Sequence, residues 1–283
     1  MAQTIRQASG GPEGPIRERK KPLPYPLSLY QTAVGKKYVM ALTGVGLLGF
    51  VVVHMIGNLH VYEGPAKMAE YAETLRTLGG GLVPRETVLW ILRAGLIAMF
   101  GLHIHSAYTL KEMSRLSSPS AGFVAGNKKY AGGQEFIAAN FASRTMRWTG
   151  PIIALYLVFH LADLTWGWVN PDFHHGDPHN NVIESLSNPG IAAIYVVANV
   201  ALAIHIYHGA WSMFQSLGIN NPKINQGRRH LAMGLAGLIL VGNLSFPLLT
   251  ATGVINDDDR ECPPGDLVCL EEELLEKEGG HSE

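Results

Sequence analysis

Histidine is the residue type that could carry chemistry inside the apolar parts of this chain. Six histidines lie within otherwise apolar segments: His54, His103, His105, His160, His205 and His208. Ionisable residues inside a bilayer are costly and are usually functional. Two imidazoles from different helices can ligate one haem iron from both faces, which leaves no open position and suits electron transfer. The histidines therefore predict haem b sites between helices.

The segments that carry these histidines are long enough to cross a membrane. Residues 38–62, 185–221 and 231–256 contain no Asp, Glu, Lys or Arg. About 20 apolar residues span roughly 30 Å of hydrocarbon as a helix. We expect an all-α fold, an integral membrane bundle of five transmembrane helices over about 37–62, 86–111, 147–169, 189–217 and 230–254. Residues 1–36 would form an N-terminal arm, residues 37–254 the haem-binding domain, and residues 255–283 an acidic tail with Cys262 and Cys269.

The placement of basic residues predicts the orientation in the membrane. The N-terminal arm and the loops after the second and fourth expected helices hold sixteen Lys and Arg residues, whereas the opposite face holds five. The positive-inside rule then places the N-terminus in the cytoplasm and the C-terminus outside the cell membrane. The net charge of −1 and the absence of a phosphate loop or dinucleotide fingerprint give no sign of nucleic-acid or nucleotide binding.

The depth of each histidine predicts which ones form pairs. At 1.5 Å per residue, His54 lies roughly 25 Å and His160 roughly 20 Å from the cytoplasmic side. On the same scale, His103 and His208 each lie roughly 12 Å deep. We therefore expect an outer pair, His54 with His160, and an inner pair, His103 with His208, and so two haems. His105 competes with His103, and His205 competes with His208.

Several further residues fit such a site. The flat macrocycle needs small neighbours, which Gly44, Gly49, Gly95 and Gly101 could provide, although small residues also serve ordinary helix packing. Arg93 could pair with a haem propionate or reach to the outer interface. Asp163 could deliver protons to a quinone or be an interfacial carboxylate. A Rieske-type cluster would need two cysteines beside two histidines, and both cysteines follow the last expected helix.

Around these histidines the sequence resembles the single-chain, five-helix, di-haem cytochrome b anchors of succinate dehydrogenases and fumarate reductases. Six segments carry the resemblance: Gly35–Gly44, His54–Leu59, Leu92–Leu96, Leu102–Ile104, Phe159–Asp163 and His208–Gly218. The resemblance implies His54, His103, His160 and His208 as axial ligands. Ile206 stands where some fumarate reductases of this family carry a carboxylate for proton movement, so that route is expected to be absent.

The resemblance also implies a function and partners. We expect a membrane anchor of succinate:quinone oxidoreductase that passes electrons from an iron–sulfur subunit, fed by a flavoprotein subunit, through haem b to quinone. The chain lacks a flavin fold, so it would not oxidise succinate alone. Two alternatives stay open at this point: a di-haem cytochrome b anchor of another respiratory oxidoreductase, and a haem-free proton or metal transporter that uses the buried histidines.

Overall fold

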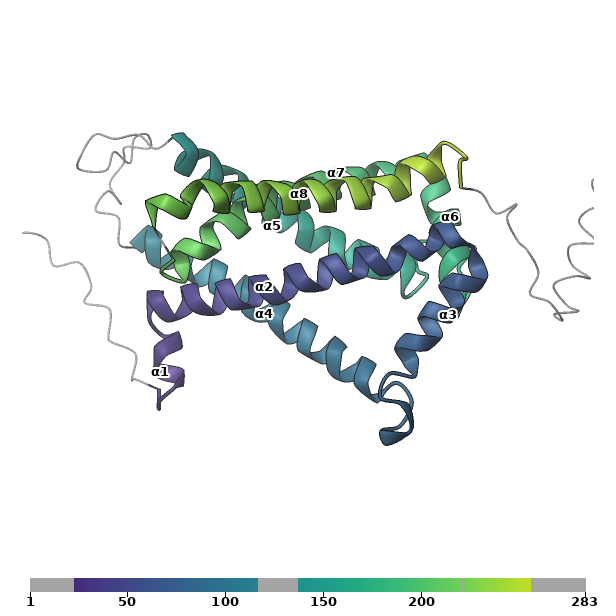
Figure 1. The fold of residues 1–283 in the computed structure, drawn as a ribbon, viewed down its shortest axis with the longest axis horizontal. Coiled ribbons are helices and arrows are strands. Elements are labelled where there is room, and N and C mark those ends of the chain that lie inside the picture. Colours follow the sequence, from purple (N-terminus) through teal and green to yellow (C-terminus); the bar gives the residue numbers. More distant parts are fainter. Residues whose placement is uncertain (1–22, 117–136, 220, 256–283) are drawn as a thin grey trace, which may run out of the picture.

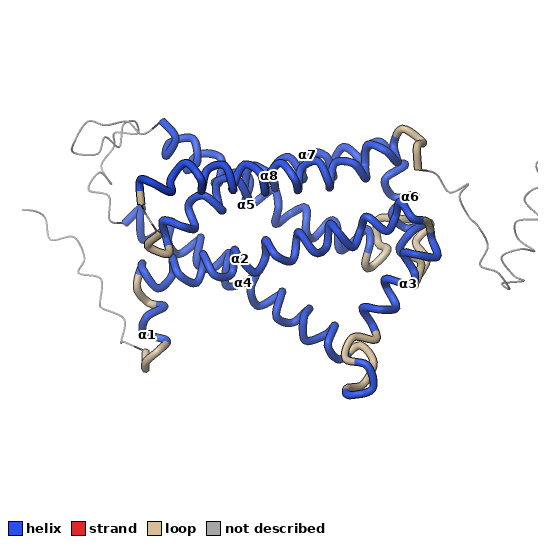
Figure 2. Tube along the Cα trace, viewed as in Figure 1, coloured by secondary structure: helices blue, strands red, loops and turns tan. Residues whose placement is uncertain are grey.

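A computed structural model describes residues 23–116, 137–219 and 221–255, and the described elements are all helical (Figures 1 and 2). Four helices are long and apolar enough to cross a membrane: α2 (Ala33–Asn58, continued by the 3₁₀ turn η1, Leu59–Glu63), α4 (Thr87–Leu116), α7 (Pro189–Ser216) and α8 (Pro222–Ala251). Outside the described residues lie positions 1–22 of the N-terminal arm, the 117–136 segment and the acidic tail with both cysteines.

The expected third membrane helix is α5 (Ile137–Leu164), which is long enough but is not among these four. Arg147, His160 and Asp163 lie in its apolar stretch and lower its mean hydropathy. Pro151 lies inside it, which membrane helices tolerate because neighbouring groups satisfy the freed carbonyl. The structure packs α5 against α7 within the same bundle (Figure 1).

Several helix bounds differ from those predicted, because hydropathy does not register capping residues. α8 begins eight residues before the predicted His230: Pro222 occupies its first turn, and the Asn221 side chain accepts a hydrogen bond from the Lys223 amide. α2 begins at Ala33, with the Thr32 hydroxyl accepting from the Gly35 amide. Polar caps and an N-terminal proline satisfy or remove the free amides at a helix start.

Three shorter helices, which the apolar runs did not predict, cover the ends of the bundle. α1 (Leu27–Tyr30) lies at one end, whereas α3 (Pro65–Arg76) and α6 (Pro178–Ser187) lie at the other (Figure 1). The Asp177 carboxylate caps α6 by accepting from the Asn180 amide. Ile183 and Leu186 of α6 are buried, so this helix closes the bundle end with apolar side chains.

α7 is the central element of the bundle, since it contacts α2, α5, α6 and α8. Its buried face is rich in alanine: Ala192, Ala198, Ala201, Ala203 and Ala210. Without a hydrophobic driving force between helices in lipid, such small residues stabilise association by allowing close packing. Tyr195 of α7 packs with Val61, Leu186 and Phe246 at one level, and Ile206 packs with Ala236 and Ile239 at another.

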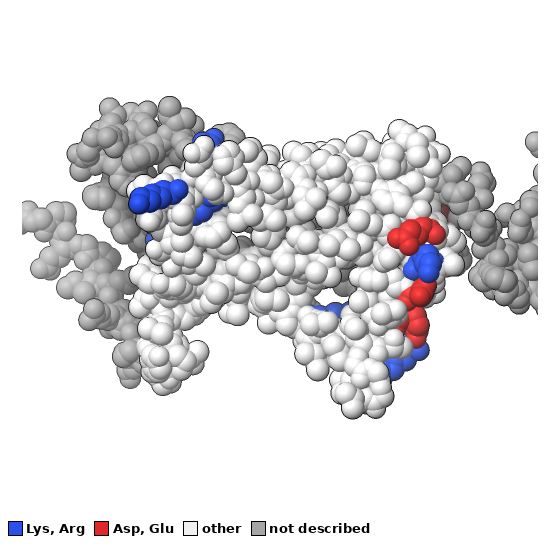
Figure 3. All heavy atoms as spheres, in the orientation of Figure 1, with Lys and Arg blue, Asp and Glu red and all other residues white. Residues whose placement is uncertain are grey.

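Charged side chains are concentrated at the two ends of the molecule on the face shown in Figure 3. Basic residues lie at the α1 end, and acidic residues, mixed with basic ones, lie along the α3 end. The wide band between them is almost free of charge on this face. This distribution matches helices that cross hydrocarbon and carry their charges at both interfaces.

Gly57, one turn after His54, provides a test of the packing between α2 and α3. A Cβ at this position would lie less than 3.0 Å from three side-chain atoms of Tyr71. We expect Gly57→Val to destabilise the protein by about 1–3 kcal/mol through overpacking. The matched control is Gly237→Val, at an exposed position where a Cβ meets no atom within 4 Å. Thermal unfolding in detergent should separate the two variants, and equal midpoints would contradict this account of the interface.

Candidate haem-binding site

His54 of α2 and His160 of α5 face each other in the half of the bundle near α3 and α6. Their ring centres lie 6.0 Å apart and their planes meet at 77°. The His54 side chain is exposed and His160 is half-buried, and each lies about one turn before the end of its long helix. The structure thus brings together the predicted outer pair.

His103 of α4 faces His205 of α7 in the other half of the bundle. Their ring centres lie 6.4 Å apart and their planes meet at 63°. Both rings are half-buried. Of the two candidates on α7, His205 is therefore the one that lies opposite His103.

The spacing in both pairs matches two imidazoles on one metal ion. A bond from a metal to an imidazole nitrogen is about 2 Å long. The nitrogen lies roughly 1 Å from the ring centre, so two rings on opposite sides of one ion have centres about 6 Å apart. The observed 6.0 and 6.4 Å agree with this value. The donor sets therefore fit two bis-histidine haems.

A threonine hydroxyl from a neighbouring helix holds each ring of the inner pair. Thr43 Oγ1 of α2 lies 3.2 Å from His103 Nδ1, and it donates to the Val39 carbonyl at 2.7 Å. Thr149 Oγ1 of α5 lies 3.2 Å from His205 Nδ1, and it donates to the Thr145 carbonyl at 3.0 Å. A hydroxyl that donates its one proton to the backbone carbonyl can accept the Nδ1–H of its histidine. In that tautomer Nε2 has a free lone pair for a metal, as is usual for oriented metal ligands.

The two layers are related by a repeated spacing on α2 and α5. Thr43 and His54 are eleven residues apart on α2, and so are Thr149 and His160 on α5. Eleven residues are about three turns, so both side chains lie on nearly the same helix face about 16 Å apart. Each of these helices therefore supplies a hydroxyl to the inner pair and a histidine to the outer pair. The sequence analysis missed both threonines, although this Thr–His spacing was visible.

His160 is held by a different partner. Its Nδ1 lies 3.3 Å from the Tyr195 hydroxyl, which donates to Asp163 Oδ2 at 2.7 Å. Ser185 Oγ of α6 donates to the same oxygen at 2.6 Å. Asp163 is 0% exposed, and its Oδ1 makes no hydrogen bond within the described part of the chain. Asp163 thus lies inside the bundle rather than at an open interface.

The competing histidines have other surroundings. His105 is exposed and its Nδ1 hydrogen-bonds the Tyr30 hydroxyl of α1 at 2.6 Å. His208 is 4% exposed, and both of its ring nitrogens are buried. The geometry favours His103 over His105 and His205 over His208.

Several glycines of the long helices leave open space at their positions, and one of them, Gly44, lies beside a histidine ring. A Cβ built on Gly49, Gly95, Gly101 or Gly209 would meet no atom within 4 Å. A Cβ on Gly44 would reach ordinary contact distance, 3.4 Å, from His103 Cε1. Figure 3 shows a hollow between α2, α4 and α3 in the half of the molecule that contains the outer pair. These features fit a flat group between the helices.

Arg93, the predicted propionate partner, is exposed on α4 and lies over the ring of Trp90, with 5.0 Å between the guanidinium carbon and the ring centre. Within the described residues, no group of three or more His, Cys, Asp or Glu side chains could hold a metal ion. Protein ligands alone therefore do not build a metal site in this part of the chain. Two axial ligands suffice for a metal that a macrocycle already holds.

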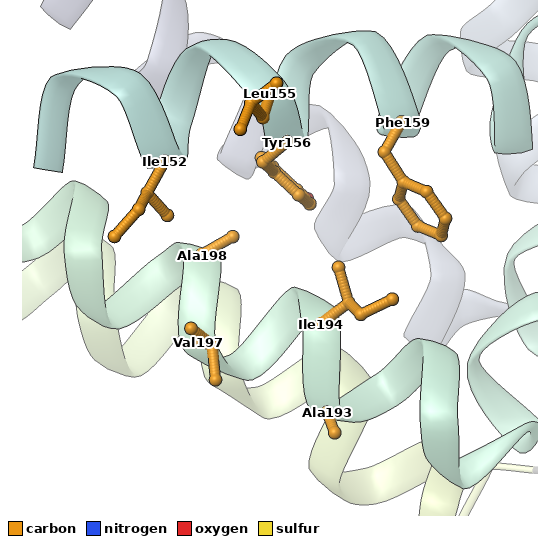
Figure 4. Close-up of a pocket in the computed structure, with 8 residues that line it drawn as sticks. All are labelled: Ile152, Leu155, Tyr156, Phe159, Ala193, Ile194, Val197 and Ala198. Atoms are coloured by element: carbon orange, nitrogen blue, oxygen red, sulfur yellow. The ribbon is translucent and has the colours of Figure 1, made fainter. Parts of the chain in front are cut away.

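An apolar groove of about 440 Å³ lies between α5 and α7 near the outer pair (Figure 4). It is lined by Ile152, Leu155, Tyr156 and Phe159 of α5 and by Ala193, Ile194, Val197 and Ala198 of α7. Hydrocarbon side chains dominate this lining, so the groove suits an alkyl chain better than a polar head group.

Comparison with known proteins agrees with this architecture. Residues 136–244, which include α5, α7 and most of α8, match the family model of the succinate dehydrogenase/fumarate reductase transmembrane subunit. The match covers less than half of the chain. No curated protein and no solved structure shows significant similarity to it. Residues 136–244 are thus similar to the transmembrane subunits of succinate dehydrogenases and fumarate reductases, and the four candidate membrane spans agree with a subunit of that kind.

Proposed function

We propose that this chain is the di-haem cytochrome b anchor of a succinate:quinone oxidoreductase. It would carry electrons from an iron–sulfur subunit, itself fed by a flavoprotein subunit, to a membrane quinone. The observation that carries the proposal is the presence of two histidine pairs at bis-imidazole spacing in a chain whose residues 136–244 match the succinate dehydrogenase/fumarate reductase transmembrane subunit.

The proposed ligands are His54 with His160 for the outer haem and His103 with His205 for the inner haem. The resemblance implied His208, but the facing rings support His205. Haem b with two imidazole ligands supplies one-electron transfer without an open position for oxygen chemistry. Thr43 and Thr149 fix the tautomer and the ring orientation of the inner ligands. The four helices exclude water and hold each ring pair at the required separation.

The arrangement in layers gives the electron path a direction. We place the N-terminus and the inner pair at the cytoplasmic side, with α5 as the fifth span and α3, α6 and the C-terminus outside. The soluble partners would dock on the basic cytoplasmic face, so the inner haem would be reduced first. Arg93 as a propionate partner and Asp163 as a proton donor to quinone remain predictions.

Purification of the tagged chain from its own membranes tests the function. The flavoprotein and iron–sulfur subunits should co-purify, with two haem b per chain in a pyridine haemochrome assay. Co-purification of a hydrogenase or formate dehydrogenase would instead support the alternative oxidoreductase. A colourless protein without partners would support a transporter.

Single histidine variants test the pairing. His54→Ala and His160→Ala should each remove the same haem, and His103→Ala and His205→Ala should each remove the other, because each iron loses one of two axial ligands. His208→Ala and His105→Ala are the matched controls, and both should retain two haems. Haem content and optical spectra of the six variants give the result. If His208→Ala loses the inner haem and His205→Ala retains it, then His208 rather than His205 is the inner ligand on α7.

Reporter fusions test the orientation. A fusion at Glu283 should be active only with a reporter that works outside the cytoplasm, whereas a fusion at Gly218, in the short connection between α7 and α8, should be active only with a cytoplasmic reporter. The opposite pattern would invert the proposed topology.

A further inference from the structure

A buried hydrogen-bonded chain connects a carboxylate to the outer histidine pair. It runs from Asp163 Oδ2 to the Tyr195 hydroxyl at 2.7 Å and from there to His160 Nδ1 at 3.3 Å. Asp163 is 0% exposed and Tyr195 is 6% exposed. The chain is therefore shielded from solvent and bridges two helices, α5 and α7.

The direction of each hydrogen bond follows from the number of protons. The Tyr195 hydroxyl has one proton, which it donates to Asp163, so its oxygen is the acceptor for the Nδ1–H of His160. Ser185 Oγ donates to the same Asp163 oxygen at 2.6 Å. Both hydroxyl–carboxylate distances are in the range of charge-assisted hydrogen bonds, about 2.5–2.7 Å. α6 thus fixes the carboxylate from outside the bundle.

Among the described residues, the hydroxyls that contact the inner pair donate to no charged group. Thr43 and Thr149 donate to the backbone carbonyls of Val39 and Thr145, which are neutral. In both layers a hydroxyl accepts from a histidine Nδ1–H and so orients the ring, but the layers differ in the group to which that hydroxyl donates. In the outer layer the acceptor is the Asp163 carboxylate.

We propose that Asp163, acting through Tyr195, positions His160 and lowers the midpoint potential of the outer haem below the value that the histidine pair alone would give. This inference rests on the proposed haem function. A hydrogen-bonded carboxylate raises the basicity of a ligating histidine. A negative charge near the iron also favours the oxidised state, which carries one more positive charge, and second-shell hydrogen bonds and charge are known levers on haem potential.

Optical redox titration of the purified complex tests this proposal. Asp163→Asn keeps the shape and an acceptor for Tyr195 but removes the charge, so the potential of the outer haem should rise while that of the inner haem stays unchanged. Tyr195→Phe breaks the chain at its middle and should raise the same potential. The outer haem is identified as the component that His54→Ala removes.

The matched control is Tyr156→Phe. The ring of Tyr156 lies 5.7 Å from that of His160, similar to the 5.9 Å of Tyr195, and no hydrogen bond joins it to His160 among the described residues. Loss of the Tyr156 hydroxyl should leave the midpoint potentials of both haems unchanged. If Asp163→Asn and Tyr195→Phe both keep two haems with unshifted midpoint potentials, this inference is wrong but the proposed function is unaffected. A wild-type complex without haem would overturn the proposed function itself.

Discussion

In this structure two imidazole rings face each other across a helix interface, and the rest of the structure depends on this constraint. A metal–nitrogen bond allows little variation in length, so two bis-histidine haems would require four helices to hold two ring pairs at about 6 Å. The observed separations of 6.0 and 6.4 Å meet that requirement. The alanine-rich face of α7 and its contacts with α2, α5 and α8 fix the helix positions that this geometry needs.

The same helices serve both layers, which links the two sites mechanically. The Thr43–His54 and Thr149–His160 spacings place an inner hydroxyl and an outer ligand on one face of α2 and of α5. A shift of either helix along its axis would therefore disturb both histidine pairs together. The layers differ mainly in the group behind the hydroxyl, a neutral carbonyl in one and the buried Asp163 carboxylate in the other.

Much of the fold and the outer pair could be predicted from sequence, because apolar run length and depth along a helix are local properties. The choice between His205 and His208 could not be predicted from sequence. Two positions that are three residues apart on a helix differ by only about 4.5 Å in depth and are neighbours on one face. In the folded structure the ring of His205 faces His103, which is why we propose His205 as the inner ligand on α7. α3 and α6 lack long apolar runs, so hydropathy did not predict them. In α5, two of the residues that lower its mean hydropathy, His160 and Asp163, belong to the candidate site.

Electron paramagnetic resonance of the oxidised complex tests most directly whether histidine pairs hold the haems. Two axial imidazoles impose a low-spin ferric state, because both axial positions are filled by strong ligands. The account predicts two low-spin signals per chain, one lost in His54→Ala and the other lost in His205→Ala. A high-spin ferric signal in the intact wild-type complex, or a single low-spin signal, would contradict two bis-histidine sites.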